Sequence, residues 1–320
     1  MNKHILKKTR EMSNSSSTTT EDNSHNEPLV TIITVCRNAS PTLEACVVSV
    51  AEQTYQYIEH IVIDGESNDG TSAILERHRG ALALVVCEPD RGIYDAMNKG
   101  LLSARGEFIL FLNADDRLVG PSAISDAIAQ IARAPDQDIY YGSLIVIGDG
   151  KATQYDPPPP DRALQEMVIG CLPHQATFTR RRVFDRTGPF NLSWRIHSDY
   201  DWWLRVLGDP SIRLCRIRTV VAEYVLGGAS SNLEKGQPEV YAIQNNAVVY
   251  CTPEWDRRRI EIYQQALLSI RVAYAKSSAL LEDSGQIDLT SILRLALLRH
   301  LPRPAVRTIK WAKDILTKAR

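Results

Sequence analysis

The sequence lacks the long apolar runs that mark membrane-spanning and secreted proteins. Its longest apolar run, residues 81–87, is far shorter than the roughly 18 residues of a spanning helix and is followed by Glu88. The N-terminal residues contain no apolar segment typical of a secretory signal. We therefore expect a cytoplasmic protein that is not exported.

The sequence also lacks an excess of charge of either sign. Basic side chains number 37 and acidic side chains 38, so the formal net charge is −1. A chain that binds nucleic acid through its overall charge is typically strongly basic. No nucleic-acid partner is expected.

Cysteine pairs and glycine-rich phosphate loops are missing too. The six cysteines form no CxxC pair and have no histidines at zinc-site spacing, so we expect reduced thiols in the core. No GxGxxG follows the first predicted strand and no GxxxxGK[ST] occurs anywhere, which disfavours dinucleotide-binding and P-loop enzymes. Any bound phosphates must be held by other groups.

What the chain does contain is an alternation of predicted strands and helices. Residues 1–28 come first and are predicted to be a disordered tail, because Ser13 to Glu27 includes no large apolar residue. Strands are then predicted at residues 29–36, 58–63, 82–87 and 108–112. Helices are predicted between them at residues 41–52, 71–79 and 93–103. This alternation is typical of an α/β fold with a mostly parallel sheet flanked by helices.

The second half of the chain has a less regular pattern. A helix is predicted from Pro121, and residues 139–156 are predicted to form two strands around a Gly-Asp-Gly turn. The run Pro157 to Pro160 excludes regular structure and marks a connection. Residues 251–320 are predicted to be a helical C-terminal region.

Each of the first four predicted strands leads directly into polar side chains. Ligands bind outside the carboxyl ends of the strands in an open parallel sheet, so four such clusters describe one crevice. The clusters are, in chain order, Thr34 with Arg37, then Asp64, then Glu88, Asp90 and Arg91, and then Asn113, Asp115 and Asp116.

The segment FLNADD brings two adjacent carboxylates to the end of a buried strand. Such carboxylates repel each other unless a cation is present, so we predict Asp115 as the ligand of a divalent metal, Mn²⁺ or Mg²⁺. Asp116 can instead cap the next helix or pair with Arg117. Together with Arg91, a metal at Asp115 would stabilise a departing nucleoside diphosphate.

The motifs of the chain occur in the order seen in glycosyltransferase family 2. They are TVCRNAS, IDGESNDGT, EPDRGIYDAMNKG, FLNADD, PHQATFTRRRVFDRTGPFN, SDYDWWLR and GGAS. The chain resembles bacterial members of this family over about residues 29–230. The resemblance implies the GT-A fold, with a domain at residues 29–250, and a role in assembling exopolysaccharide, O-antigen or glycolipid. It also implies an inverting transfer of a sugar from a nucleoside-diphosphate donor, expected to be a UDP-sugar, to a hydroxyl of a saccharide or lipid-linked acceptor.

The resemblance assigns several residues to the donor site. Thr34, Val35 and Arg37 would lie beside the base or ribose. Asp64 would read the edge of the nucleobase, and Arg91 would face the diphosphate.

The same resemblance places Asn113 where the family's DxD motif has its first aspartate. An amide can still form a hydrogen bond with a ribose or sugar hydroxyl. It removes one negative charge near the metal, so this departure puts the metal affinity in question.

The family's ED motif corresponds to Ser198 and Asp199, with serine in place of the usual acidic residue. An inverting transfer needs a base for the acceptor hydroxyl, opposite the leaving diphosphate, and the resemblance assigns that role to Asp199. Asp201 matches a second carboxylate that can steady it. From spacing alone, Asp199 can instead cap a helix, and Asp201 can pair with Arg205.

Three further features have two interpretations each. His174 can contact the acceptor or a sugar hydroxyl, or it can be structural. Trp202 and Trp203 can stack on a sugar, but adjacent helical residues face different ways, so we expect core packing. Gly228, in GGAS, can belong to a loop that closes over the donor or to a plain turn.

Residues 291–320 contrast with the neutral whole, because they carry eight basic side chains against one acidic side chain. Their apolar residues favour an amphipathic helix. Such a helix can lie peripherally on the inner face of the cell membrane, or it can pack on the protein or remain in solvent.

Two other functions are open at this point. A sugar nucleotidyltransferase also combines an α/β sheet with metal-binding carboxylates, but it usually needs a glycine-rich phosphate loop, and CRNASPT is a poor one. A non-catalytic nucleotide-sugar-binding scaffold subunit would account for Asn113 and Ser198.

Overall fold

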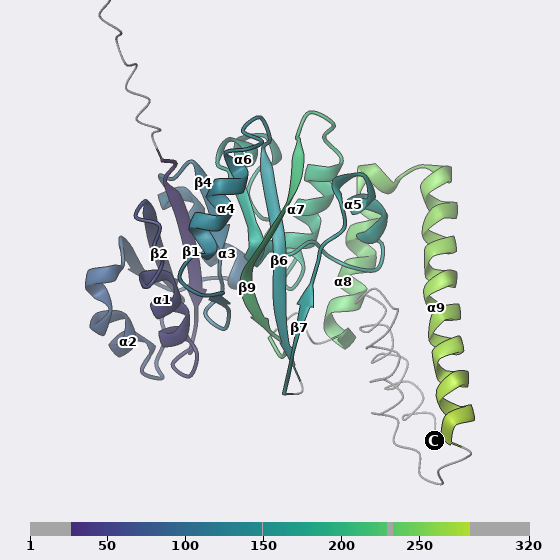
Figure 1. Ribbon diagram of the computed structural model, residues 1–320, viewed down its shortest axis with the longest axis horizontal. Helices are drawn as coiled ribbons and strands as arrows, with labels where there is room; N and C mark the ends of the chain where they lie inside the picture. The colour runs from purple at the N-terminus through teal and green to yellow at the C-terminus, as the bar shows by residue number, and fades with distance from the viewer. Residues whose placement is uncertain (1–26, 149, 229–232, 282–320) are drawn as a thin grey trace, which may run out of the picture.

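Figure 1 shows the computed structural model of the chain, which describes residues 27–148, 150–228 and 233–281. In chain order the elements are β1 (Val30–Cys36), α1 (Leu43–Ala51), β2 (Ile58–Asp64), α2 (Thr71–Arg77), η1 (Arg79–Ala81), β3 (Leu84–Cys87), α3 (Ile93–Ser103), β4 (Phe108–Phe111), β5 (Arg117–Leu118), α4 (Ala123–Ile131), β6 (Ile139–Gly148), β7 (Lys151–Tyr155), α5 (Pro160–Glu166), η2 (His174–Ala176), β8 (Thr177–Arg180), α6 (Arg182–Thr187), α7 (Ser198–Leu207), β9 (Leu214–Val225), α8 (Leu233–Asn246), η4 (Val248–Tyr250) and α9 (Pro253–Leu281).

The strands of the described residues form one nine-stranded sheet in the order β3-β2-β1-β4-β8-β6-β9-β5, with β7 paired to β6. The strands β3, β2, β1 and β4 are parallel neighbours. They are joined through α1, α2 and α3, which are the crossover connections that parallel strands require. Beyond them β8 is antiparallel to both β4 and β6, whereas β6 and β9 are again parallel. The carboxyl ends of the first four strands therefore share one edge.

Helices cover both faces of the sheet (Figure 1). On one face, Cys46 of α1 and Ala127 of α4 pack against the strands. On the other face, Met97 of α3 and Trp203 of α7 belong to a second apolar cluster. The molecule is thus a helix–sheet–helix sandwich, and α9 extends beside it as a long helix.

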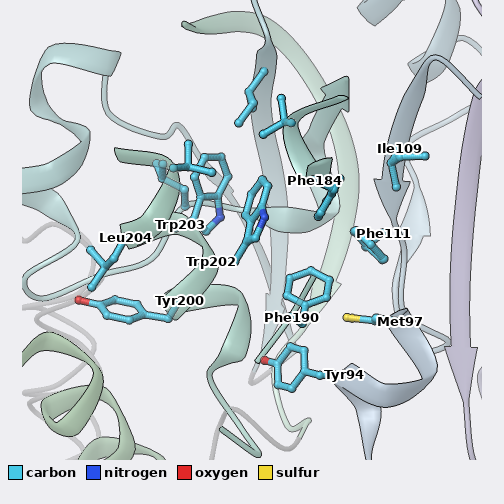
Figure 2. Close-up of a cluster of buried hydrophobic side chains, with 14 of the residues drawn as sticks. Tyr94, Met97, Ile109, Phe111, Phe184, Phe190, Tyr200, Trp202, Trp203 and Leu204 are labelled. Atoms are coloured by element: carbon cyan, nitrogen blue, oxygen red, sulfur yellow. The ribbon is translucent and has the colours of Figure 1, made fainter. Parts of the chain in front are cut away.

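Figure 2 shows the cluster on the α7 face. Trp202 stacks on Phe184 with ring centroids 5.0 Å apart, and Trp203 meets Trp202 edge-on at 5.2 Å. The two tryptophans are only 4% and 0% exposed. Their predicted core packing is confirmed, and stacking on a sugar is wrong for this structure because neither ring reaches the surface.

The predicted strands and helices of the first half are confirmed, with ends that differ by two residues or less. The predicted hairpin is confirmed as the antiparallel pair β6 and β7. The helix expected from Pro121 begins at Ala123. Pro160 does not belong to an irregular connection but is the first residue of α5, where its missing N–H costs no helical hydrogen bond.

The C-terminal region is helical where the structure describes it, since α9 runs to Leu281. The predicted N-terminal tail up to residue 26 and the basic segment 291–320 lie outside the described residues. Among the described residues, no helix is both long and apolar enough to cross a bilayer. The boundary at residue 250 stays a prediction.

The prediction that all six cysteines are core thiols is wrong for two of them. Cys36 and Cys46 are buried, but Cys87 and Cys251 are exposed, because one ends the edge strand β3 and the other lies in the turn before α9. All six are free thiols.

A tight contact of backbone with backbone holds the amino-terminal side of β1. A Cβ atom at Gly106 would lie 2.6 Å from the Thr31 nitrogen and 2.8 Å from the Leu29 carbonyl oxygen. The Gly106 N–H also donates to Thr31 Oγ1 at 2.8 Å. Only a residue without a side chain fits here.

Gly106→Ala is therefore expected to lower the free energy of unfolding by about 1–3 kcal/mol, because β1 or the loop before β4 must move. Denaturant unfolding measures the loss. Gly80→Ala is the control, since a Cβ there meets nothing within 4 Å, and its effect should stay within about 0.5 kcal/mol. Equal stability of the two variants would show that the backbone contact has no such role.

Candidate donor and acceptor site

The predicted crevice starts at the carboxyl ends of β1, β2 and β3, where Cys36, Asp64 and Cys87 are aligned in register across the three strands. Asp64 is fully buried. Its carboxylate accepts hydrogen bonds from the hydroxyl of Ser67 at 2.5 Å and from the Ser67 N–H at 3.2 Å. A nucleobase could contact Asp64 only if the Ser67 loop released these bonds.

Two thiols complete the surroundings of Asp64. Cys87 Sγ lies 3.2 Å and Cys36 Sγ 3.7 Å from its carboxylate oxygens. Burial, and then the negative charge of Asp64, raises the pKa of the Cys36 thiol. The thiol therefore stays protonated and acts as a hydrogen-bond donor.

The prediction for Thr34 needs a correction. Its side chain is fully buried, and its hydroxyl lies 3.0 Å from His60 Nε2 and 3.7 Å from Cys46 Sγ. Thr34 precedes the strand end by two residues and faces the helix α1, so its side chain does not enter the crevice. Val35 is also buried, and its side chain belongs to the apolar cluster on the α7 face of the sheet. Only Arg37 of the three predicted residues is exposed.

Arg91, which is predicted to face the diphosphate, lies in the loop between β3 and α3. Its side chain is 77% exposed and its Nη2 lies 2.9 Å from Asp95 Oδ1. Its backbone N–H donates to the other oxygen of Asp95 at 3.1 Å. An exposed pair of this kind contributes little to stability, so the guanidinium is free to turn toward an anionic ligand.

The carboxylates after β4 differ in their surroundings. Asp116 is 1% exposed, and in the described part of the chain neither of its oxygens forms a hydrogen bond of normal geometry, although the Gln175 side chain and the Val225 backbone partly offset the rise in its pKa. Burial, and then the charge of Asp115, raises the pKa of Asp116 to about 7. Both alternatives for Asp116 are wrong, because Arg117 pairs with Glu223 and the next helix begins only at Ala123.

Asp115 is partly exposed and lies beside Gly228. A Cβ atom at Gly228 would lie 3.2 Å from Asp115 Oδ2. Asp115 comes just before β5 and Gly228 just after β9, and these two strands are antiparallel neighbours, so the fold brings together residues that are far apart in the sequence. Ala229 and Ser230 of the GGAS motif lie outside the described residues, so the two interpretations of the motif stay open. Within the described ranges, no three His, Cys, Asp or Glu side chains are grouped to hold a metal by themselves.

The predicted base Asp199 belongs to a chain of hydrogen bonds. Its Oδ2 lies 3.1 Å from His174 Nδ1, and its Oδ1 lies 2.7 Å from the hydroxyl of Tyr94. His174 Nε2 in turn lies 3.3 Å from Asn113 Nδ2. The chain connects the position of the DxD motif with that of the ED motif.

These contacts set the charge of the pair. Burial raises the pKa of Asp199, but the hydrogen bond and charge of His174 outweigh it, and the pKa of Asp199 is lowered overall. Burial lowers the pKa of His174, but its bond to Asp199 and the nearby carboxylates raise it overall. Asp199 is therefore ionised, and His174 is the member of the pair that titrates nearer to neutral pH.

The structure decides whether Asp199 caps a helix and whether Asp201 pairs with Arg205. The helix begins at Ser198 with His197 as its N-cap residue, so Asp199 is not a cap. Asp201 forms an ion pair with Arg205 at 3.1 Å, and residues two apart on a helix face different sides. The prediction that Asp201 steadies Asp199 is therefore wrong, and its alternative as a partner of Arg205 is confirmed.

Two contributors to the site were missed in the sequence. Tyr94, near the start of α3, is 6% exposed, and its hydroxyl donates a hydrogen bond to Asp199. Glu239 of α8 accepts hydrogen bonds from the three successive N–H groups of residues 195–197, at 2.7–3.0 Å, and so fixes the loop before α7. No local sequence pattern indicates this contact, because Glu239 lies more than 40 positions after the loop that it holds.

The arrangement therefore offers two kinds of chemistry at one edge of the sheet. Uncompensated carboxylates at the end of β4 favour a bound cation. A hydrogen-bonded carboxylate and imidazole lie close by and can accept a proton.

The chain is similar to known proteins of one family. A family model described as Glycosyl transferase family 2 matches residues 31–198. A PGL/p-HBAD biosynthesis glycosyltransferase of Mycobacterium bovis (strain BCG / Pasteur 1173P2) is 34% identical over 212 residues, which are 64% of this chain and 80% of that protein. The Escherichia coli UDP-Glc:alpha-D-GlcNAc-diphosphoundecaprenol beta-1,3-glucosyltransferase WfgD is 29% identical over 65% of this chain and 81% of its own length.

Solved structures show the same fold at low sequence identity. Residues 1–349 of S. aureus TarS, in complex with UDP-GlcNAc, superpose with a TM-score of 0.59 at 18% identity, over 73% of each chain. The mannosyltransferase PcManGT of Pyrobaculum calidifontis, in complex with GDP-Man and Mn²⁺, gives 0.53 at 17% identity, over 91% of this chain and 88% of that one. The α/β fold with helices on both faces is thus the GT-A fold. Since the family model covers more than half of the chain, the protein belongs to glycosyl transferase family 2 and is a glycosyltransferase.

Proposed function

We propose that this glycosyltransferase moves a sugar, with inversion, from a UDP-sugar to a hydroxyl of a saccharide or lipid-linked acceptor in the assembly of a bacterial surface polysaccharide or glycolipid. The observation that carries the proposal is the hydrogen-bonded chain Asn113–His174–Asp199. It joins the end of β4, where the donor's diphosphate would lie, to a base suited to the acceptor. An inverting transfer needs this combination, because the hydroxyl attacks from the side opposite the leaving group.

The choice of donor and acceptor rests on relatives. The matched TarS structure is a complex with UDP-GlcNAc. WfgD is named as an enzyme that uses UDP-Glc and a diphosphoundecaprenol-linked acceptor. These names support a UDP-sugar and a lipid-linked acceptor here. Membership of the family disfavours the nucleotidyltransferase alternative, and turnover by the isolated protein would separate an enzyme from a scaffold subunit.

A divalent cation fits the end of β4. Mg²⁺ and Mn²⁺ are commonly held by one or two carboxylates together with substrate phosphates, so a full cage of protein ligands is not required. Asp115 is the accessible carboxylate there, and the buried Asp116 adds negative charge beside it. When bound, the metal would stabilise negative charge on the leaving diphosphate. Arg91, which is exposed, would assist by binding the same group.

The first test is thermal unfolding with UDP, GDP, dTDP and CDP, each with and without Mn²⁺. A nucleotide at about 100 times its Kd adds roughly 2.7 kcal/mol and raises the Tm by several degrees. We expect UDP with Mn²⁺ to give the largest shift, and Asp115→Ala to remove it. Asp136→Ala, at an exposed site, should keep the full shift. A shift with no nucleotide would contradict the proposed donor site.

Asp116 provides a test that needs no ligand. Its raised pKa means that the folded protein holds a proton that the unfolded chain releases, so stability falls as the pH rises from about 4 to about 7. In metal-free buffer, Asp116→Asn should raise the free energy of unfolding by about 2–4 kcal/mol at pH 8, and the gain should shrink as the pH falls toward 5. Denaturant unfolding across this range measures it, with Asp136→Asn as the control. A gain in stability that does not depend on pH would show that the pKa of Asp116 is not raised in the folded protein.

Asp199→Asn should lower kcat by at least about 100-fold, because an amide cannot take the proton of the acceptor hydroxyl. The UDP-dependent rise in Tm should remain, since Asp199 lies outside the predicted nucleotide contacts. A coupled assay of UDP release measures kcat. Turnover close to that of the parent would remove Asp199 from the mechanism.

A further inference from the structure

The hydroxyl of Tyr94 has two acceptors within reach but only one hydrogen to donate. Its oxygen lies 2.7 Å from Asp199 Oδ1 and 2.8 Å from the backbone carbonyl oxygen of Ile196. A phenol carries a single O–H group, so it donates to one of these two oxygens at a time. The hydroxyl therefore has two alternative hydrogen bonds, one to the proposed base and one to the backbone.

Packing fixes the ring of Tyr94 in this place. Tyr94 lies in the first turn of α3, and its ring packs on that of Phe190 with centroids 5.5 Å apart (Figure 2). One turn further along α3, the side chain of Asn98 donates to the Phe190 carbonyl and accepts from the Phe190 N–H, both at 2.9 Å. These contacts join α3 to the segment that leads into α7.

The second acceptor, the carbonyl of Ile196, is also fixed. The N–H groups of Ile196 and His197 both donate to Glu239 Oε1, at 2.8 and 2.7 Å. The His197 N–H belongs to the same peptide group as the Ile196 carbonyl, so its bond to Glu239 orients that carbonyl. The helix α8 therefore holds the second acceptor beside Tyr94.

The charge of Asp199 decides which of the two bonds forms. A hydrogen bond to an ionised carboxylate is roughly twice as strong as one between neutral groups, so the hydroxyl donates to Asp199 while Asp199 is ionised. Burial, and then the charge of Asp199, raises the pKa of Tyr94 well above its usual value, so the phenol keeps its hydrogen. After Asp199 has taken up a proton, the advantage of its charge is lost. The carbonyl of Ile196 then competes for the hydroxyl on equal terms.

We propose that Tyr94 is a positioning residue for the base. Its hydroxyl holds the Asp199 carboxylate before the transfer and turns to the Ile196 carbonyl when Asp199 takes the proton of the acceptor hydroxyl. This inference rests on the proposed function. A donor with no second acceptor would lose its only strong bond at that moment and would oppose the proton transfer. The nearby carbonyl reduces this opposition.

The atoms and charges of the transfer balance around Asp199. The acceptor oxygen forms a bond to the anomeric carbon, the bond from that carbon to the diphosphate oxygen breaks, and its electron pair leaves with the nucleoside diphosphate. The proton of the acceptor hydroxyl moves to the carboxylate of Asp199. Tyr94 keeps its own hydrogen throughout and changes only the oxygen to which it donates.

The first experiment compares Tyr94→Phe with the parent enzyme at saturating Mn²⁺. The ring and its packing remain, and only the hydroxyl is lost. We expect kcat to fall by about 10-fold, because the carboxylate is no longer held in place, and the donor KM to stay within about threefold. Tyr141→Phe is the matched control, since the buried Tyr141 donates to the backbone carbonyl of Pro158 at 2.9 Å, and its kcat should stay that of the parent. A kcat of Tyr94→Phe within twofold of the parent value would overturn the proposal.

The second experiment asks whether Tyr94 acts through Asp199. Tyr94→Phe is combined with Asp199→Asn, and the residual rate of UDP release is measured in a single turnover. A positioning role predicts a change of less than about twofold on adding Tyr94→Phe, because the group that it positions is already lost, whereas independent effects would multiply. A further loss of about 10-fold in the double variant would show a structural role instead.

Thermal unfolding tests the second acceptor. In Asp199→Ala the carboxylate is gone, and the Ile196 carbonyl is the remaining acceptor for Tyr94 among the described residues. Adding Tyr94→Phe to Asp199→Ala should therefore lower the Tm by about as much as adding Tyr141→Phe, which also removes a bond to a backbone carbonyl. An unchanged Tm on adding Tyr94→Phe would contradict the turn toward Ile196.

Nucleotide binding separates this inference from the proposed function. If Tyr94→Phe keeps both its kcat and the Tm shift with UDP and Mn²⁺, the donor site stands and only the role of Tyr94 fails. If the parent itself shows neither this shift nor turnover, the proposed function fails first.

Discussion

The hydrogen bond between His174 Nδ1 and Asp199 Oδ2 is the contact on which the arrangement of the site depends. His174 begins the short helix before β8, and β8 pairs with β4, so its ring is carried by the sheet. Asp199 is carried by α7, which two buried tryptophans anchor. The bond therefore connects α7 to the edge of the sheet where Asn113 and Asp115 follow β4. Glu239 supports this connection, because it fixes the loop that leads into α7.

Much of the fold follows from local patterns in the sequence. The β-branched runs of β1 and β2 indicate buried parallel strands, and the alternation of such runs with stretches of helical length predicts the helices between them. The location of the site also follows, since polar residues after Asp64 and Phe111 can only meet at one edge of the sheet. Thr34 shows where this reasoning stops. A polar residue near a strand end was taken as a ligand contact, but alternation along the strand turned it toward α1 and His60.

The other features of the site that the sequence does not indicate depend on contacts between segments far apart in the chain. His174 and Asn113 are 61 positions apart and Tyr94 and Asp199 are 105 apart, so no spacing rule joins them. The missing ion pair between Asp116 and Arg117 is equally hidden, because the two are neighbours in the sequence, and only the fold shows that Arg117 turns to Glu223. Long-range pairing thus decides which of several plausible polar residues do chemistry and which hold the structure.

The sequence and the structure give opposite meanings to Asn113. In the sequence, the missing carboxylate looks like a loss of charge and hence of metal affinity. In the structure, its amide nitrogen faces His174 Nε2, while Asp115 and Asp116 still supply two carboxyl groups at the end of β4. A third carboxylate would add repulsion to a place where the buried Asp116 already has a raised pKa. The amide avoids that repulsion, so Asn113 limits the negative charge at the strand end while its side chain contacts His174.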